Sequence, residues 1–291
     1  MPAQLSDKYH QEIDENGFTV IKGLLTPSQI SEYLKYSQEL VNRARSGSWP
    51  YVRLNGKQFP PWDKPTDKPD IWGITHLMHP KWGQKTSDKF QEIYSSSELT
   101  NVVKDILQTE ELTMELFNML INPTIQDFEL AWHRDDIKNT ATSEEEMAIL
   151  KMDAYAGAQF NLALTHDENL IVVPKSHKRV RTEEERSKLK FEQISEQLIV
   201  VLEPGDCVFY NPNILHRATY STKRERVCLH GCYGAHSDIG KDRARLVLQH
   251  GVGDWIDELK PVNSAMKEMS DRLKFIAHEM KGKELGYSLD G

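Results

Sequence analysis

His133, Asp135 and His216, which lies 81 residues after that aspartate, are of the types and spacing that can bind one metal ion. Two histidines and one carboxylate leave a face of an octahedral ion open, and non-haem Fe(II) oxygenases bind a cosubstrate and oxygen there. Residues two apart on a strand point to the same face, so His133 and Asp135 can reach the same metal. Such a pair also arises by chance, so the surrounding sequence decides its meaning.

An arginine follows the second histidine closely in the sequence. His216 lies in the stretch PGDCVFYNPNILHRA, and Arg226 follows ten residues later in an alternating, strand-like run. A guanidinium group binds a carboxylate through two parallel hydrogen bonds, most strongly where it is buried. Arg226 is therefore a candidate for binding a carboxylate. Arg224 has the same strand parity and is the alternative.

Five motifs, in the right order and across most of the chain, resemble the phytanoyl-CoA dioxygenase-like (PhyH-like) family of Fe(II)/2-oxoglutarate oxygenases. The likeness is greatest to fungal members that tailor secondary metabolites. The motifs are ENGFTVIKGLLTPSQISEYLKYSQELV near the start, WHRDD at 132–136, LTHDENLIVVPKSH at 164–177, PGDCVFYNPNILHRA, and RVCLHGCY at 226–233. The chain departs from the family at Asn169-Leu170 and Lys175, where relatives have glycine after asparagine and after proline. It also has Ala131 where some relatives have a glutamine that contacts 2-oxoglutarate.

The resemblance implies Fe(II), the cosubstrate 2-oxoglutarate and O2 as the cofactors. It implies that His133, Asp135 and His216 are the metal ligands and catalytic centre, and that Arg226 and Thr165 bind the cosubstrate. The expected reaction oxidises an unactivated C–H bond by hydroxylation, desaturation or ring formation. A carboxylate at position 135 argues against halogenation, because halogenating relatives have a small residue there.

The expected substrate is a small molecule, a fungal secondary metabolite of terpenoid or peptide origin, with an amino acid or an acyl-CoA as the alternative. Candidate substrate contacts are Trp72, His76, Met78 and Trp132. Two other classes of protein use similar residues. A non-catalytic cupin-like binding protein would keep the fold without turnover, and a zinc hydrolase would use the same ligands to activate water.

Composition and charge narrow the class of protein further. The 291 residues carry a formal net charge of −8, whereas a nucleic-acid-binding domain is usually basic. No apolar run approaches the length of a membrane span, and the N-terminus has no apolar signal core. The three cysteines read as free buried thiols. We expect a cytoplasmic enzyme that binds neither nucleic acid nor membrane, and the sequence leaves its oligomeric state open.

The pattern of elements predicts a mainly β domain spanning 1–291, with a double-stranded β-helix (jelly-roll, cupin-like) core at about 111–236 and helical flanks. Thr26 and Pro27 are typical of a helix start after a strand at 17–25. A single helix is expected at 88–108 and another at 257–283. The Pro-rich segment 47–87 reads as a long irregular loop, and 142–152 and 181–197 read as short surface helices.

Overall fold

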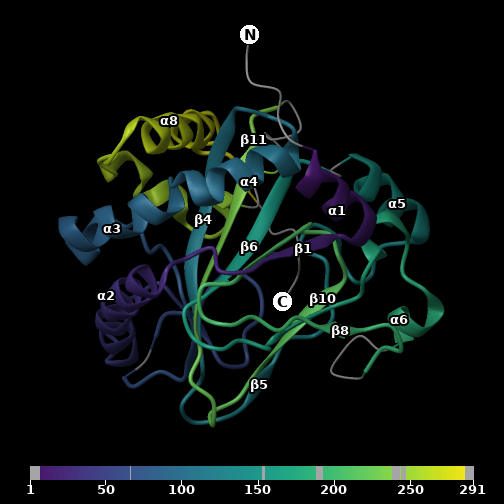
Figure 1. The fold of residues 1–291 in the computed structure, drawn as a ribbon, viewed down its shortest axis with the longest axis horizontal. Coiled ribbons are helices and arrows are strands. Elements are labelled where there is room, and N and C mark those ends of the chain that lie inside the picture. Colours follow the sequence, from purple (N-terminus) through teal and green to yellow (C-terminus); the bar gives the residue numbers. More distant parts are fainter. Residues whose placement is uncertain are drawn as a thin grey trace.

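The strands form two antiparallel sheets in this computed structural model, which describes residues 7–65, 67–152, 155–187, 193–237, 243 and 247–285 (Figure 1). The larger sheet has the order β1 (Phe18–Ile21), β9 (Cys207–Tyr210), β6 (Gly157–Ala163), β11 (Val227–Ala235), β4 (Leu112–Ile121), β3 (Ile71–Ile74) and β2 (Val52–Leu54). The smaller sheet has the order β5 (Phe128–Glu129), β10 (His216–Tyr220), β7 (Leu170–Val172) and β8 (Leu198–Ile199). The predicted jelly-roll core with flanking helices is confirmed.

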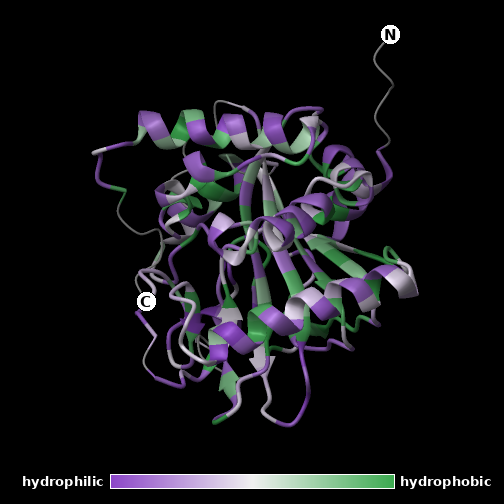
Figure 2. Cartoon of the chain, turned by 90° about the vertical axis from the view of Figure 1, so that its left-hand side faces the viewer, coloured by the Kyte–Doolittle hydropathy of each residue, from purple (hydrophilic) through white to green (hydrophobic). Residues whose placement is uncertain are grey.

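Helices surround this core, as Figure 1 shows. They are α1 (Lys8–Asn16), α2 (Pro27–Arg45), α3 (Gln84–Tyr94), α4 (Ser97–Leu107), α5 (Ser143–Met152), α6 (Glu183–Ser187) and α8 (Ser264–Glu279), with 3-10 turns at Pro80–Trp82, Ser176–Lys178, Val252–Asp254 and Ile256–Glu258. In Figure 2 the helices alternate hydrophilic and hydrophobic residues around more hydrophobic strands. No helix in the described part of the chain is long and apolar enough to cross a membrane.

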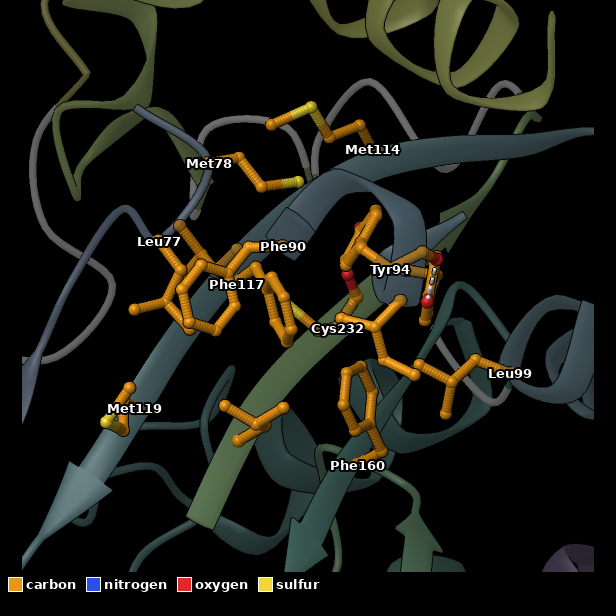
Figure 3. Packing of buried hydrophobic residues seen from close by; sticks show 14 of the residues in the cluster. Leu77, Met78, Phe90, Tyr94, Leu99, Met114, Phe117, Met119, Phe160 and Cys232 are labelled. Atoms are coloured by element: carbon orange, nitrogen blue, oxygen red, sulfur yellow. Dashed lines mark hydrogen bonds between the residues drawn. The ribbon is translucent and has the colours of Figure 1, made fainter. Parts of the chain in front are cut away.

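Strand β4 is buried along its whole length because both of its faces are covered. Phe117 and Met119 point to one side, where they pack in the main core beneath the helices (Figure 3). Leu116 and Leu120 point to the other side and line the cavity between the sheets. The larger sheet thus has the helices packed on one face and the cavity on the other.

The start of α2 follows the sequence prediction. Thr26 accepts a hydrogen bond from the backbone N–H of Gln29, and the Gln29 side chain accepts one from Thr26 N, which is a complete capping box. Pro27 occupies the first turn, where its missing N–H costs nothing. This cap fixes where the chain leaves β1 and crosses the outside of the larger sheet.

Three expected elements differ from those in the structure. The 47–87 segment is not wholly irregular, because it contains β2 and β3, which extend the larger sheet at one edge. The expected 88–108 helix is two helices, since Ser96 caps α4 by accepting from Leu99 N and so ends the preceding turn. The C-terminal helix begins at Ser264, where Asn263 provides the cap. Of the expected 181–197 helix, residues 188–192 lie outside the described residues.

Candidate metal centre

His133 and His216 lie opposite each other where the chain enters the smaller sheet. Each backbone N–H donates to the other residue's carbonyl at 3.0 Å, which forms an isolated antiparallel bridge. Their rings are 4.3 Å apart, and Asp135 lies beside them. One potential ligand atom from each of the three residues lies within 4.8 Å of the others, so the fold brings the predicted triad together.

Backbone carbonyls orient both imidazole rings. His133 Nδ1 lies 2.8 Å from the carbonyl oxygen of Ala131, and His216 Nδ1 lies 2.8 Å from that of Ile214. Because a carbonyl oxygen only accepts, each Nδ1 carries a proton, and in the neutral ring the lone pair is then on Nε2. Both Nε2 atoms face Asp135 Oδ1, at 3.5 and 3.8 Å. Such a second hydrogen bond fixes the tautomer of a metal-binding histidine.

The charges of the triad also suit a cation. Burial, followed by the neighbouring His133, lowers the pKa of His216 to about 4, so this ring is neutral at pH 7. For Asp135, burial raises the pKa, but the attraction of His216 and His133 and the Gln159 amide outweigh it, and the pKa falls below its usual range. Gln159 donates to Asp135 Oδ2. Two imidazole nitrogens and a carboxylate fit Fe(II), and their shared side opens into the cavity.

Arg226 lies deep in the same cavity, only 2% exposed. Its Nε donates to Asp167 Oδ2 at 2.8 Å, whereas Nη1 and Nη2 are buried without a hydrogen-bond partner. Burial lowers the pKa of Arg226, but the Asp167 carboxylate more than offsets this, so the group stays charged. A carboxylate group of a dicarboxylate such as 2-oxoglutarate would accept hydrogen bonds from both of these buried Nη atoms. Arg224, by contrast, is exposed and pairs with Glu168.

The other predicted cosubstrate contact, Thr165, lies elsewhere. Its hydroxyl accepts from the backbone N–H of Val227 at 2.9 Å, and the residue is not part of the cavity lining. In this position it joins the loop after β6 to the start of β11, and it supports Arg226 through the neighbouring backbone. The structure therefore does not bring Thr165 to the metal triad.

Of the four candidate substrate contacts, Trp72 alone lines the cavity. Met78 packs in the main core near Leu77 and Phe90 (Figure 3). His76 is buried on the same side as Trp255, and burial lowers its pKa to about 3. Trp132 is fully buried in a small apolar cluster with Leu215. The fold thus places His76, Met78 and Trp132 outside the lining.

The cavity contains residues that sequence reasoning missed. The loop at 58–62 folds over the triad: Gln58 hydrogen-bonds both backbone groups of Ala131 and lies 3.1 Å from His133 Nδ1, and Phe59 meets the His133 ring edge-on. Trp62 donates to His250 at 3.1 Å and so joins this loop to the C-terminal segment. Further lining residues are Arg53, Gln159, Asn161, Tyr210, Arg217, Tyr220, His230 and Arg243.

Comparison with known proteins adds a family match. The model of the family described as "Phytanoyl-CoA dioxygenase (PhyH)" matches residues 13–228. Among curated proteins, no relative matches the chain.

Solved structures share the fold at low sequence identity. AviO1 from Streptomyces viridochromogenes Tue57 is 14% identical over 81% of this chain and 97% of its own, with a TM-score of 0.57. EctD from S. alaskensis, solved with 2-oxoglutarate and 5-hydroxyectoine, is 16% identical over 80% of this chain and 77% of its own, with a TM-score of 0.56. The epimerase SnoN, solved with Fe3+, alpha ketoglutarate and nogalamycin RO, is 15% identical over 78% of this chain and 82% of its own, with a TM-score of 0.52.

Proposed function

The chain belongs to the phytanoyl-CoA dioxygenase (PhyH) family of Fe(II)- and 2-oxoglutarate-dependent dioxygenases, and on that premise we propose that it oxidises an unactivated C–H bond of a small organic molecule at the cavity between its two sheets. His133, Asp135 and His216 hold the iron, and Arg226 holds the far carboxylate of 2-oxoglutarate. The observation that carries this proposal is the shared cavity: the three ligand side chains and the two orphaned Arg226 donors open into the same space.

Each part of the site has a task in this reaction. The Ala131 and Ile214 carbonyls hold the two rings with Nε2 free for the metal, and Gln159 holds the carboxylate of Asp135. Arg226 fixes the cosubstrate's direction because Asp167 leaves only its Nη atoms free. When bound, the iron, 2-oxoglutarate and O2 supply the oxidising power, and 2-oxoglutarate leaves as succinate and carbon dioxide. The chain's share is to position the C–H bond and to exclude water.

The substrate proposed here is a secondary metabolite of terpenoid or peptide origin, with an amino acid or an acyl-CoA as alternatives. An aromatic lining supports a molecule with apolar surface: Phe59, Trp62, Trp72 and Tyr220 all face the cavity. The choice among hydroxylation, desaturation and ring formation depends on which C–H bond this lining presents. A cytoplasmic location is part of the proposal and is supported by the three cysteines, all free and buried.

The test is anaerobic. Fe(II) and then 2-oxoglutarate are added to metal-free protein, and the visible spectrum is recorded. A weak charge-transfer band that requires both additions is expected in the wild type and in Arg224→Ala, and it should be lost in His133→Ala and Arg226→Ala. Arg224→Ala is the matched control because it removes an exposed arginine two positions away.

Two rival functions predict different outcomes. A zinc hydrolase has no need of 2-oxoglutarate, so its metal site would show no response to that addition. A cupin-like binding protein would bind ligands but form no succinate when oxygen is admitted. No band in folded wild-type protein would rule out the proposed function.

A further inference from the structure

A second arginine, Arg53, faces the cavity from β2, the edge strand of the larger sheet. It is 8% exposed, so its charge is held away from solvent. Its guanidinium carbon lies 5.0 Å from the ring of Trp62 and 5.2 Å from that of Trp72. Two indoles therefore hold this cation in place on the cavity wall.

Arg53 differs from the other arginines of the cavity lining because its charge is not paired with a carboxylate in the described part of the chain. It makes no ion pair with a carboxylate among the described residues, and its buried Nε has no hydrogen-bond partner. Burial lowers its pKa, which reflects the cost of keeping this charge away from water. The other three each have a carboxylate partner; the pairs are Arg217–Glu129 at 2.9 Å, Arg226–Asp167 at 2.8 Å and Arg243–Glu115 at 2.8 Å.

The neighbouring strand leaves room for this side chain. Gly73 on β3 pairs with Arg53 across the sheet. A Cβ added at Gly73 would lie 2.9 Å from Arg53 Cδ and 3.2 Å from its Cβ and Cγ. The absence of a side chain at position 73 thus lets the stem of Arg53 lie flat across β3 and reach the cavity.

We propose that Arg53 binds a carboxylate group of the organic substrate, which makes that substrate an organic acid. The inference rests on the proposed function and narrows its substrate class. A single flat guanidinium matches a planar carboxylate, which can accept two of its hydrogen bonds. A phosphate would call for more donors, but Arg217 and Arg243 are paired with carboxylates, and the free donors of Arg226 are assigned to 2-oxoglutarate. The indoles beside Arg53 suit an acid whose remaining part is apolar.

The cosubstrate is the other carboxylate that enters this cavity, and its anchor is already present. Arg226 offers two free donors and lies 4.7 Å from the ring of Tyr220. The rings of Tyr220 and Trp72 are 5.3 Å apart, and the guanidinium carbon of Arg53 lies 5.2 Å from the Trp72 ring. Arg226 thus lies against the Tyr220 ring and Arg53 against the Trp72 ring, and we assign the cosubstrate to Arg226 because its two buried donors have no partner.

The experiment compares matched acids and esters. Benzoate, phenylacetate and hexanoate are each titrated beside their methyl esters into anaerobic protein loaded with Fe(II) and 2-oxoglutarate, and binding is measured by calorimetry. Wild-type protein should bind the acids at least about tenfold more tightly than the esters, roughly one charge-assisted contact. Arg53→Gln should abolish this preference and keep the 2-oxoglutarate affinity within about threefold. Equal binding of acids and esters by the wild type would overturn the proposal.

A second variant separates the role of Arg53 from its contribution to folding. Gly73→Ala keeps the charge but crowds the Arg53 stem, so it should reduce the acid preference while leaving the 2-oxoglutarate band intact. If Arg53→Gln or Gly73→Ala instead weakens 2-oxoglutarate as strongly as Arg226→Gln does, Arg53 belongs to the cosubstrate site and the proposal is wrong.

The test also distinguishes this inference from the proposed function. If wild-type protein lacks the 2-oxoglutarate-dependent band, the proposed function fails. The acid preference of metal-free protein, followed by quenching of tryptophan fluorescence, then still decides whether Arg53 binds carboxylates.

Discussion

Arg226 and Asp167 form an ion pair in which both side chains are 2% exposed and Nε donates to Oδ2 at 2.8 Å. The pair leaves the outer edge of the guanidinium group free and aimed at the cavity. A carboxylate so placed orients the cation and also removes the cost of burying it unpaired.

Asp167→Ala should therefore have two effects. Leaving Arg226 buried without its partner should lower the free energy of unfolding by about 3–5 kcal/mol, measured by urea denaturation. The affinity for 2-oxoglutarate should fall as the guanidinium group loses its orientation. Glu168→Ala, which breaks the exposed pair with Arg224, is the matched control and should cost no more than ~1 kcal/mol. Equal losses in the two variants would contradict this account.

Gln58 should raise the affinity for the metal without being one of its ligands. It holds both backbone groups of Ala131, whose carbonyl in turn orients His133. Removing such a supporting contact typically weakens metal binding by about 10–100-fold, and this is the result expected for Gln58→Ala in an anaerobic Fe(II) competition titration. Gln84→Ala, which alters an exposed glutamine of α3, should leave Fe(II) affinity unchanged.

Buried histidines should make the metal-free protein sensitive to acid. Burial lowers the pKa of His177 from 6.5 to about 4. Between these pH values the unfolded chain binds a proton and the folded chain does not, so stability falls as pH drops from about 6.5 towards 4. His177→Gln should reduce the slope of unfolding free energy against pH by up to ~1.4 kcal/mol per unit. Gln84→Ala, at an exposed residue that does not titrate, should keep the wild-type slope.

Met78 should prove to be a core residue. It is 1% exposed and packs in the cluster beneath the helices (Figure 3). Met78→Ala should lower the free energy of unfolding by about 2–5 kcal/mol, because a cavity remains where the side chain was. The 2-oxoglutarate-dependent band should persist in the folded variant. A variant that keeps its stability but loses the band would instead place Met78 at the site.

The sequence predicted those features that local patterns specify. The motif order placed His133, Asp135 and His216 together, although the strand expected at His133 and Asp135 is only a single bridge in the structure. His216 opens β10, Arg226 directly precedes β11, and Thr26 opens a helix through contacts within four residues. Each prediction needed only neighbouring residues or the order of motifs along the chain. The jelly-roll followed because its strands have clear alternating or continuous apolar patterns.

Features created by contacts between distant segments could not be predicted this way. Gln58 reaches His133 across 75 positions, and Trp62 reaches His250 across 188. Strands β2 and β3 are three and four residues long and lie among prolines, so their patterns are too short to detect. Nothing in the local sequence distinguishes Arg53 from other strand residues, because its contacts with Trp62 and Trp72 are formed by the fold.

The segments that carry His133 and His216 are about 80 residues apart in the chain, and the backbone bridge between these two histidines continues the pairing of β5 with β10. A metal held by both rings would act as a removable crosslink that closes this long loop. The folded fraction of the protein then depends on the concentration of free metal, by the same mass action that governs any ligand of the native state. Iron supply would thus control the lifetime of the enzyme as well as its catalytic rate.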